Sequence, residues 1–174
     1  VHCGGLTGQT RGQALVNTIS GLRQALDAMD AEGVGDVRLC IETMGKINVL
    51  GDLDEVIRIC QSDDRLLPCV DFGHLNARTM GGMTTRAQLS GALDALHSGL
   101  GAERARVFHA HFSKIEYGKG GEVRHLTFAD SEYGPEFEPL ARLIAERDLA
   151  PHIICESAGT QAEDAQAMKS LYLS

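Results

Sequence analysis

Four side chains that can bind a metal ion stand at the ends of separate short apolar runs, namely Glu42, Asp71, His109 and Glu156. Carboxylates and imidazoles are common ligands of divalent cations, and a metal site requires that they converge from rigid elements. If the runs are neighbouring parallel strands, all four side chains lie at the same edge of one sheet. A single acid after a strand is more often a helix cap or a solvated residue, but this recurrence predicts a shared metal centre.

Further histidines could extend this centre. His74 follows the second of the four residues closely, and His2 ends the first short segment at the position that matches the other strand ends. His109 and His111 are two positions apart and share a face if the strand continues, so either could be the ligand and the other its neighbour. His125 lies in a long loop, where a ligand and a solvated histidine fit the sequence equally well.

A segment of about 20 residues without a helix or strand pattern runs from Lys114 to Pro135, and loops of that length are usually functional or mobile. Lys114, Lys119 and Arg124 lie in it together with several glycines. Such a loop could close over the metal face and bind an anionic substrate such as a phosphate. A solvated loop explains the same composition. Lys114 and Arg124, with His111, are the candidate substrate-binding residues.

Strand-like apolar runs alternate with helix-like apolar stripes along the chain. The runs cover residues 37–41, 66–70, 105–110 and 152–155, and the stripes fall within residues 15–29, 53–60, 85–100, 137–144 and 160–172. This alternation predicts an α/β fold with parallel strands and helices outside them. The glycine-containing segments after the strand ends, and residues 114–135, are expected to be loops.

Length and composition restrict the class of protein. The 174 residues suit one domain that spans residues 1–174. The net charge of −8 provides no basic surface for nucleic acid, although a metal cluster can itself attract phosphate. The five cysteines include no Cys-x-x-Cys pair and indicate buried, reduced thiols in a cytoplasmic protein. No apolar run approaches the roughly 20 residues that cross a bilayer, so no membrane partner is expected.

Several motifs resemble, in order and spacing, the metal-binding strand ends of endonuclease IV, an apurinic/apyrimidinic endonuclease of the xylose isomerase-like TIM barrel superfamily. They are HCGG at 2–5, IET at 41–43, CVDFGH at 69–74, FHAHFSK at 108–114 and CES at 155–157. Each motif is short, but their order is specific and they extend over nearly the whole chain. The resemblance implies a zinc-dependent hydrolase that cleaves DNA 5′ to abasic sites in base-excision repair, with a metal-activated hydroxide as nucleophile.

The resemblance also implies roles for the candidate residues, with up to about three zinc ions in the complete protein. Glu42 would bridge two of the ions, and Glu42 and Glu156 would be the catalytic carboxylates. The remaining assignments are His2 for the first zinc, Asp71, His109 and Glu156 for the second, and His74 and His125 for the third.

The family is an eight-stranded α/β barrel, and the motifs match its second half. The chain resembles the part from the tail of strand 4 through helix 8, because a complete TIM barrel typically needs about 250 residues. We therefore expect it to pair with a missing N-terminal half or to self-associate through exposed sheet edges. The expected substrate is DNA with abasic sites.

Differences from endonuclease IV leave two alternatives open. Val123 stands where the family places an Asp ligand of the third zinc, and Glu122 is the nearest substitute. A sugar isomerase or epimerase of the same superfamily would hold a single Mn²⁺, Mg²⁺ or Co²⁺ with the four strand-end ligands. Its two glutamates would act as acid and base on a sugar or sugar phosphate. The other alternative is a half-barrel that binds metal weakly and has no catalytic activity.

Overall fold

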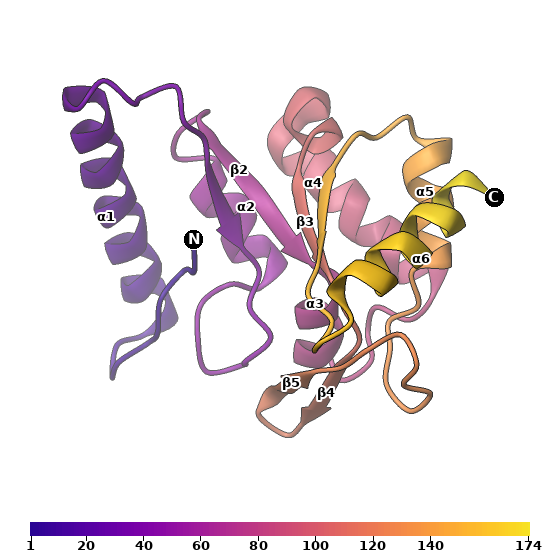
Figure 1. Ribbon diagram of the computed structural model, residues 1–174. Helices are drawn as coiled ribbons and strands as arrows, with labels where there is room; N and C mark the ends of the chain where they lie inside the picture. Colours follow the sequence, from indigo (N-terminus) through magenta and orange to yellow (C-terminus); the bar gives the residue numbers. More distant parts are fainter.

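The computed structural model describes residues 1–174 and arranges them around a parallel sheet with a layer of helices (Figure 1). The strands of this sheet are β1 (Leu39–Glu42), β2 (Leu66–Asp71), β3 (His109–Phe112) and β6 (His152–Cys155), and a separate hairpin consists of β4 (Ile115–Gly118) and β5 (Gly121–His125). The helices are α1 (Arg11–Ala31), α2 (Leu53–Cys60), α3 (Phe72–Arg78), α4 (Arg86–Arg106), α5 (Glu138–Glu146) and α6 (Gln161–Leu173).

The sheet strands run parallel in the order β1-β2-β3-β6, so their carboxyl ends meet at one edge. The register pairs Glu42 with Cys69 and Asp71 with His111. His2 forms a further parallel bridge with Glu42, so the first residues continue the sheet beyond β1. The predicted parallel α/β architecture is therefore confirmed.

The helices outside the sheet pack as a continuous layer, with α1 on α2, α2 on α4, α4 on α5, and α5 on α6. Two of them begin where the sequence provides a complete capping box. In each box the side chain of the first residue accepts a hydrogen bond from the backbone N–H of the second, and the side chain of the second accepts one from the backbone N–H of the first. Asp52 and Glu55 form this pair at the start of α2, and Thr85 and Gln88 form it at the start of α4. These bonds satisfy the free N–H groups of the first turn, which helps to fix where each helix begins relative to the preceding strand.

The face of the sheet that points away from this layer is only partly covered. His109 and His111 on β3 are half-buried, and Ile154 on β6 is 49 % exposed. Strand β6 pairs with β3 along one side and with no other strand. The fold is therefore an open, partial barrel.

Three segments differ from the sequence-based predictions. The strand expected over residues 105–110 begins only at His109, because α4 continues through Arg106. The segment after β2, expected to be a loop, forms the short helix α3. Asp71 caps this helix by accepting a hydrogen bond from the His74 N–H at 2.7 Å. The expected loop over residues 114–135 contains the β4–β5 hairpin.

The hairpin lies beyond the carboxyl ends of the sheet strands (Figure 1) and docks on the loop between β1 and α2. The N–H of Glu122 donates to the carbonyl oxygen of Gly45 at 3.1 Å, and the N–H of Ile47 donates to that of Gly120 at 3.2 Å. A Cβ atom on Gly121, which has φ +88°, would lie 2.1 Å from the Gly45 oxygen. Only glycine permits this approach, which holds the hairpin against the edge where the strands end.

All five cysteines are free, and four of them are buried, as their apolar surroundings in the sequence predicted. No helix combines the length and the apolar character needed to cross a membrane.

Candidate metal centre

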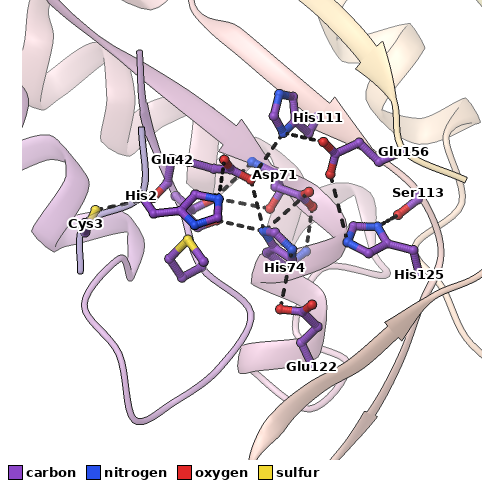
Figure 2. A network of polar contacts seen from close by, with 12 residues as sticks. His2, Cys3, Glu42, Asp71, His74, His111, Ser113, Glu122, His125 and Glu156 are labelled. Atoms are coloured by element: carbon purple, nitrogen blue, oxygen red, sulfur yellow. Dashed lines mark hydrogen bonds and ion pairs between the residues drawn. The ribbon is translucent and has the colours of Figure 1, made fainter. Parts of the chain in front are cut away.

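Three carboxylates and one imidazole converge where the sheet strands end (Figure 2). One oxygen from each of Glu42, Asp71 and Glu156 and one ring nitrogen of His111 all lie within 4.8 Å of one another. Glu42, Asp71 and His111 belong to β1, β2 and β3, and Glu156 directly follows β6. We call these four residues the strand-end cluster. Its oxygen and nitrogen donors suit a divalent cation held by rigid elements.

Asp71 provides the clearest test of whether this cluster fits a cation. Its side chain is fully buried, and its Oδ1 accepts the hydrogen bond that caps α3. Its Oδ2 accepts no hydrogen bond, although the Nδ1 of His74 lies 3.4 Å away. Burial raises the pKa of Asp71 to about 6 by more than His74 lowers it, because a buried carboxylate is costly unless a proton or a cation satisfies it. A metal ion in the cluster would supply that partner.

The sequence left open which histidine of β3 would be the ligand, and the structure places His111 among the carboxylates, whereas His109 lies with His111 and Cys69 in another group. The Nδ1 atom of His111 lies 3.2 Å from Glu42 Oε1 and 3.2 Å from Glu156 Oε1. His109 precedes it on the same face of β3, and the two rings pack edge to face with centroids 5.3 Å apart. Since β3 begins and ends later than the sequence suggested, the second histidine stands at the strand end.

A second group lies beside the strand-end cluster and consists of His74, Glu122 and His125, whose ligand atoms also lie within 4.8 Å of one another. We call it the hairpin cluster. The Nδ1 of His74 lies 2.9 Å from the carbonyl oxygen of Thr43, and the Nδ1 of His125 lies 2.8 Å from the hydroxyl of Ser113. The Nε2 of His74 faces Glu122 at 3.5 Å. Hydrogen bonds at Nδ1 fix the ring orientation of a metal-binding histidine and leave Nε2 as the ligand atom.

Two glutamates connect these groups into one centre (Figure 2). Glu156 turns Oε1 toward His111 and Oε2 toward the Nε2 of His125, at 3.9 Å. Glu42 turns Oε1 toward the Nδ1 atoms of His111, at 3.2 Å, and of His74 in the hairpin cluster, at 3.5 Å, and its Oε2 lies 3.3 Å from the Nε2 of His2. Each carboxylate therefore has its two oxygens beside different imidazoles. This is the arrangement required of a carboxylate that bridges neighbouring cations.

The protonation equilibria of the centre reflect this crowding. Burial raises the pKa of Glu42, but the hydrogen bond with His111 and the charges of the nearby histidines lower it by more, so the net shift is downward. The same hydrogen bond raises the pKa of His111. Burial and the neighbouring His111 lower the pKa of His109. The carboxylates thus favour the protonated form of His111, and a bound cation would compete with that proton.

Lys114 and Arg124, which the sequence suggested as substrate-binding residues, are engaged elsewhere. Lys114 is buried, and its Nζ donates to the carbonyl oxygen of Asp130 at 2.7 Å and to Glu136 Oε1 at 2.6 Å. Arg124 is exposed, and its Nε donates to Glu116 Oε2 within the hairpin at 2.6 Å. Neither residue lines the hollow over the metal centre. They stabilise the segments that carry the site.

An open hollow of about 480 Å³ lies over the centre, and its lining consists of His2, Glu42, Met44, Lys46, Val49, His74, Glu122, His125 and Glu156. The sequence did not point to Lys46. It suggested Glu122 only as a substitute for the Asp ligand that the family places at position 123. Val123, at the family's Asp position, is 57 % exposed, because it is the unpaired residue of a bulge in β5, between Glu122, which pairs with Tyr117, and Arg124, which pairs with Glu116. Strict alternation would place Glu122 and His125 on opposite faces, so the pattern of β5 did not indicate Glu122, and no spacing signal pointed to Ser113.

Comparison with known proteins places this arrangement in a family. Residues 1–172 match the family model described as xylose isomerase-like TIM barrel. An uncharacterized protein from Methanocaldococcus jannaschii is 33% identical over 150 residues, which cover 86% of this chain and 54% of that protein. Mannonate dehydratase from Streptococcus suis serotype 2 has a similar fold, with a TM-score of 0.61 and 16% identity over 94% of this chain and 49% of that one.

The chain spans about half the length of both relatives. The superfamily consists of enzymes, among them isomerases, epimerases, endonucleases and dehydratases, and its members typically bind metals. The parallel sheet, the ligand-type residues at its strand ends and the match over residues 1–172 agree with one another. The chain therefore belongs to the xylose isomerase-like TIM barrel family.

Proposed function

We propose that this chain carries the metal centre of a zinc-dependent phosphodiesterase of the endonuclease IV type, which cleaves DNA 5′ to abasic sites. The observation that carries the proposal is the connection of two ligand groups through Glu42, which lies beside His111 and His74, and Glu156, which lies beside His111 and His125. A single-metal enzyme needs only the strand-end cluster. The hairpin cluster, with two histidines oriented by Thr43 and Ser113, supports at least one further cation.

In phosphodiester hydrolysis, the residues of the centre would hold the cations that activate water and bind the phosphate. Bound divalent cations lower the pKa of water and neutralise charge on the phosphate in enzymes of this kind. Glu42 and Glu156 would hold the cations at fixed separation, and Asp71 would anchor one of them from the fully buried end of β2. His74 and His125 would present Nε2 on the hairpin side. The open hollow above them would admit an extended strand of DNA.

A single-metal sugar isomerase or epimerase is the second candidate. The strand-end cluster is complete without the hairpin cluster, since it already offers three carboxylates and an imidazole. In that reaction Glu42 and Glu156 would exchange a proton with the two sides of a sugar carbon skeleton. The presence of a second, oriented histidine pair beside this cluster favours the phosphodiesterase.

An incision assay tests the proposal. Zinc-loaded protein is incubated with a duplex that contains a single abasic site, and in parallel with aldose and ketose sugars. We expect incision 5′ to the abasic site, and we expect the Glu42→Gln variant to fall below about 1% of the wild-type rate while it keeps its fold by circular dichroism. Sugar interconversion without incision would refute the phosphodiesterase and favour the isomerase.

A further inference from the structure

Lys46 is the only lysine or arginine among the residues that line the hollow over the metal centre. The other lining residues are three glutamates, three histidines, Met44 and Val49. No carboxylate oxygen lies within 4.0 Å of the Lys46 ammonium group, since it takes part in no ion pair. By contrast, Lys114 and Arg124 are each bound to a glutamate. Lys46 is therefore a cation at the site that no acidic side chain neutralises.

The loop that contains Lys46 is held in place by two arginines, Arg11 at the start of α1 and Arg78 at the end of α3. The Nη1 of Arg78 donates to the carbonyl oxygen of Lys46 at 2.6 Å, and its Nη2 donates to that of Val49 at 3.2 Å. Arg11 donates to the carbonyl oxygens of Ile47 and Val49, each at 3.1 Å. These contacts fix the carbonyl groups of a loop that would otherwise be free to move.

The hairpin holds the same loop from the other side. Lys46 forms an antiparallel bridge with Gly121, the residue that directly precedes Glu122 of the hairpin cluster. The loop and the hairpin cluster are thus joined by backbone contacts. The backbone of Lys46 therefore has a fixed position relative to the metal ligands, and its exposed side chain lines the hollow above them.

We propose that Lys46 binds a phosphate group of the substrate at the rim of the metal centre and so selects phosphate-bearing substrates. The inference rests on the proposed function, because it assumes cations in the centre below. An ammonium group binds phosphate oxygens through charge-assisted hydrogen bonds. The phosphate could belong to a DNA backbone or to a sugar phosphate, and both present the same group to Lys46.

Binding of inorganic phosphate to the zinc-loaded protein tests this inference by isothermal titration calorimetry, with zinc content measured on each sample. We expect Lys46→Gln to weaken phosphate binding roughly tenfold, with zinc content unchanged, and Lys46→Arg to retain most of the affinity. Lys119→Gln is the matched control, since Lys119 is an exposed lysine of the hairpin turn outside the hollow and should bind phosphate as the wild type does.

The outcomes separate the two proposals. Equal phosphate affinity in wild type and Lys46→Gln, or no phosphate binding by a protein that retains zinc, would overturn the role of Lys46 and leave the metal centre intact. A wild-type protein that retains no zinc would overturn both. Two further ligands identify the source of the phosphate, namely an abasic-site duplex and a ketose phosphate. The ligand whose binding Lys46→Gln weakens is the one that Lys46 contacts.

Discussion

Asp71 combines full burial with a carboxylate oxygen that accepts no hydrogen bond. Its position follows from two simple constraints. It ends a strand in which every residue is buried, and its Oδ1 is used to cap the helix that follows. Oδ2 therefore faces inward, where the Nδ1 of His74 lies 3.4 Å away without a hydrogen bond. Asp71 should therefore destabilise the metal-free protein and bind the cation in the metal-bound protein.

The Asp71→Asn substitution should separate these two effects. In wild-type metal-free protein, burial raises the pKa of Asp71 from 3.8 in the unfolded chain to about 6. The native state then holds the extra proton, so its stability should fall as pH rises from about 4 to about 6. Asp71→Asn should remove this pH dependence and stabilise the metal-free protein at pH 7 by on the order of 2 kcal/mol, measured by urea unfolding with a chelator.

The same variant should lose its tightly held zinc. Asp36→Asn serves as the control, since Asp36 is exposed and remote from the centre. A metal-free Asp71→Asn protein that is less stable than wild type at pH 7 would show that the contact of Asp71 with His74 outweighs the cost of burying the carboxylate.

The two histidines of β3 provide a second residue-scale prediction. His111 contacts Glu42 and Glu156, whereas His109 contacts His111 and lies away from the carboxylates. His111→Ala should therefore lower zinc affinity by at least about tenfold, and His109→Ala should leave it within a factor of about two. Competition with a chromophoric chelator measures both. The reverse order would restore His109 as the ligand.

The sequence identified most residues of the centre because acids that follow buried strands are easy to recognise. Glu42, Asp71 and Glu156 each follow an apolar run, and the parallel register then brings them together. The choice between His109 and His111 stayed open because Ala105 and Arg106 extend α4, so the sequence did not locate the strand end. Their composition fits a helix or a strand, so the start of β3 could not be located from the pattern.

At the level of whole elements, the β4–β5 hairpin is the part that the sequence did not predict. Its strands are short, polar and rich in glycine, and they lack the apolar run that marks a strand of the sheet. The hairpin forms because it docks on the β1–α2 loop, a contact between segments far apart in the chain. Helix α3 was also not predicted, because it begins directly at the end of β2 and contains Gly73, a residue that is unfavourable within a helix.

Gly121→Ala tests whether this docking positions the hairpin cluster. The new Cβ would meet the Gly45 carbonyl oxygen at 2.1 Å, at a backbone φ of +88°. We expect a loss of stability of about 1–3 kcal/mol in urea unfolding and weaker binding of the cation at the hairpin cluster. Gly120→Ala is the matched control, because a Cβ there meets no atom within 4 Å. Equal behaviour of the two variants would show that the contact is not required.

At the level of the whole molecule, the sheet is open along β6, and its inner face carries the half-exposed Ile154. An uncovered strand edge beside an apolar side chain favours pairing with further polypeptide. We propose that further polypeptide, either another segment or a second copy of this chain, pairs with this edge.

Association of the 174-residue chain should therefore depend on this edge. We expect analytical ultracentrifugation to show concentration-dependent self-association that Ile154→Lys weakens roughly tenfold, because a charge on the inner face opposes burial. Val16→Lys on the exposed side of α1 is the control. A chain that stays monomeric at high concentration in both variants and in wild type would contradict the expectation.

The central claim is that the strand-end and hairpin clusters form one centre that holds more than one cation. Elemental analysis of protein loaded with zinc and then dialysed tests it most directly. The structure predicts about two or three tightly held zinc ions per chain, and the loss of at least one of them in His125→Ala. A single retained ion that His125→Ala leaves in place, or no retained ion, would contradict the claim.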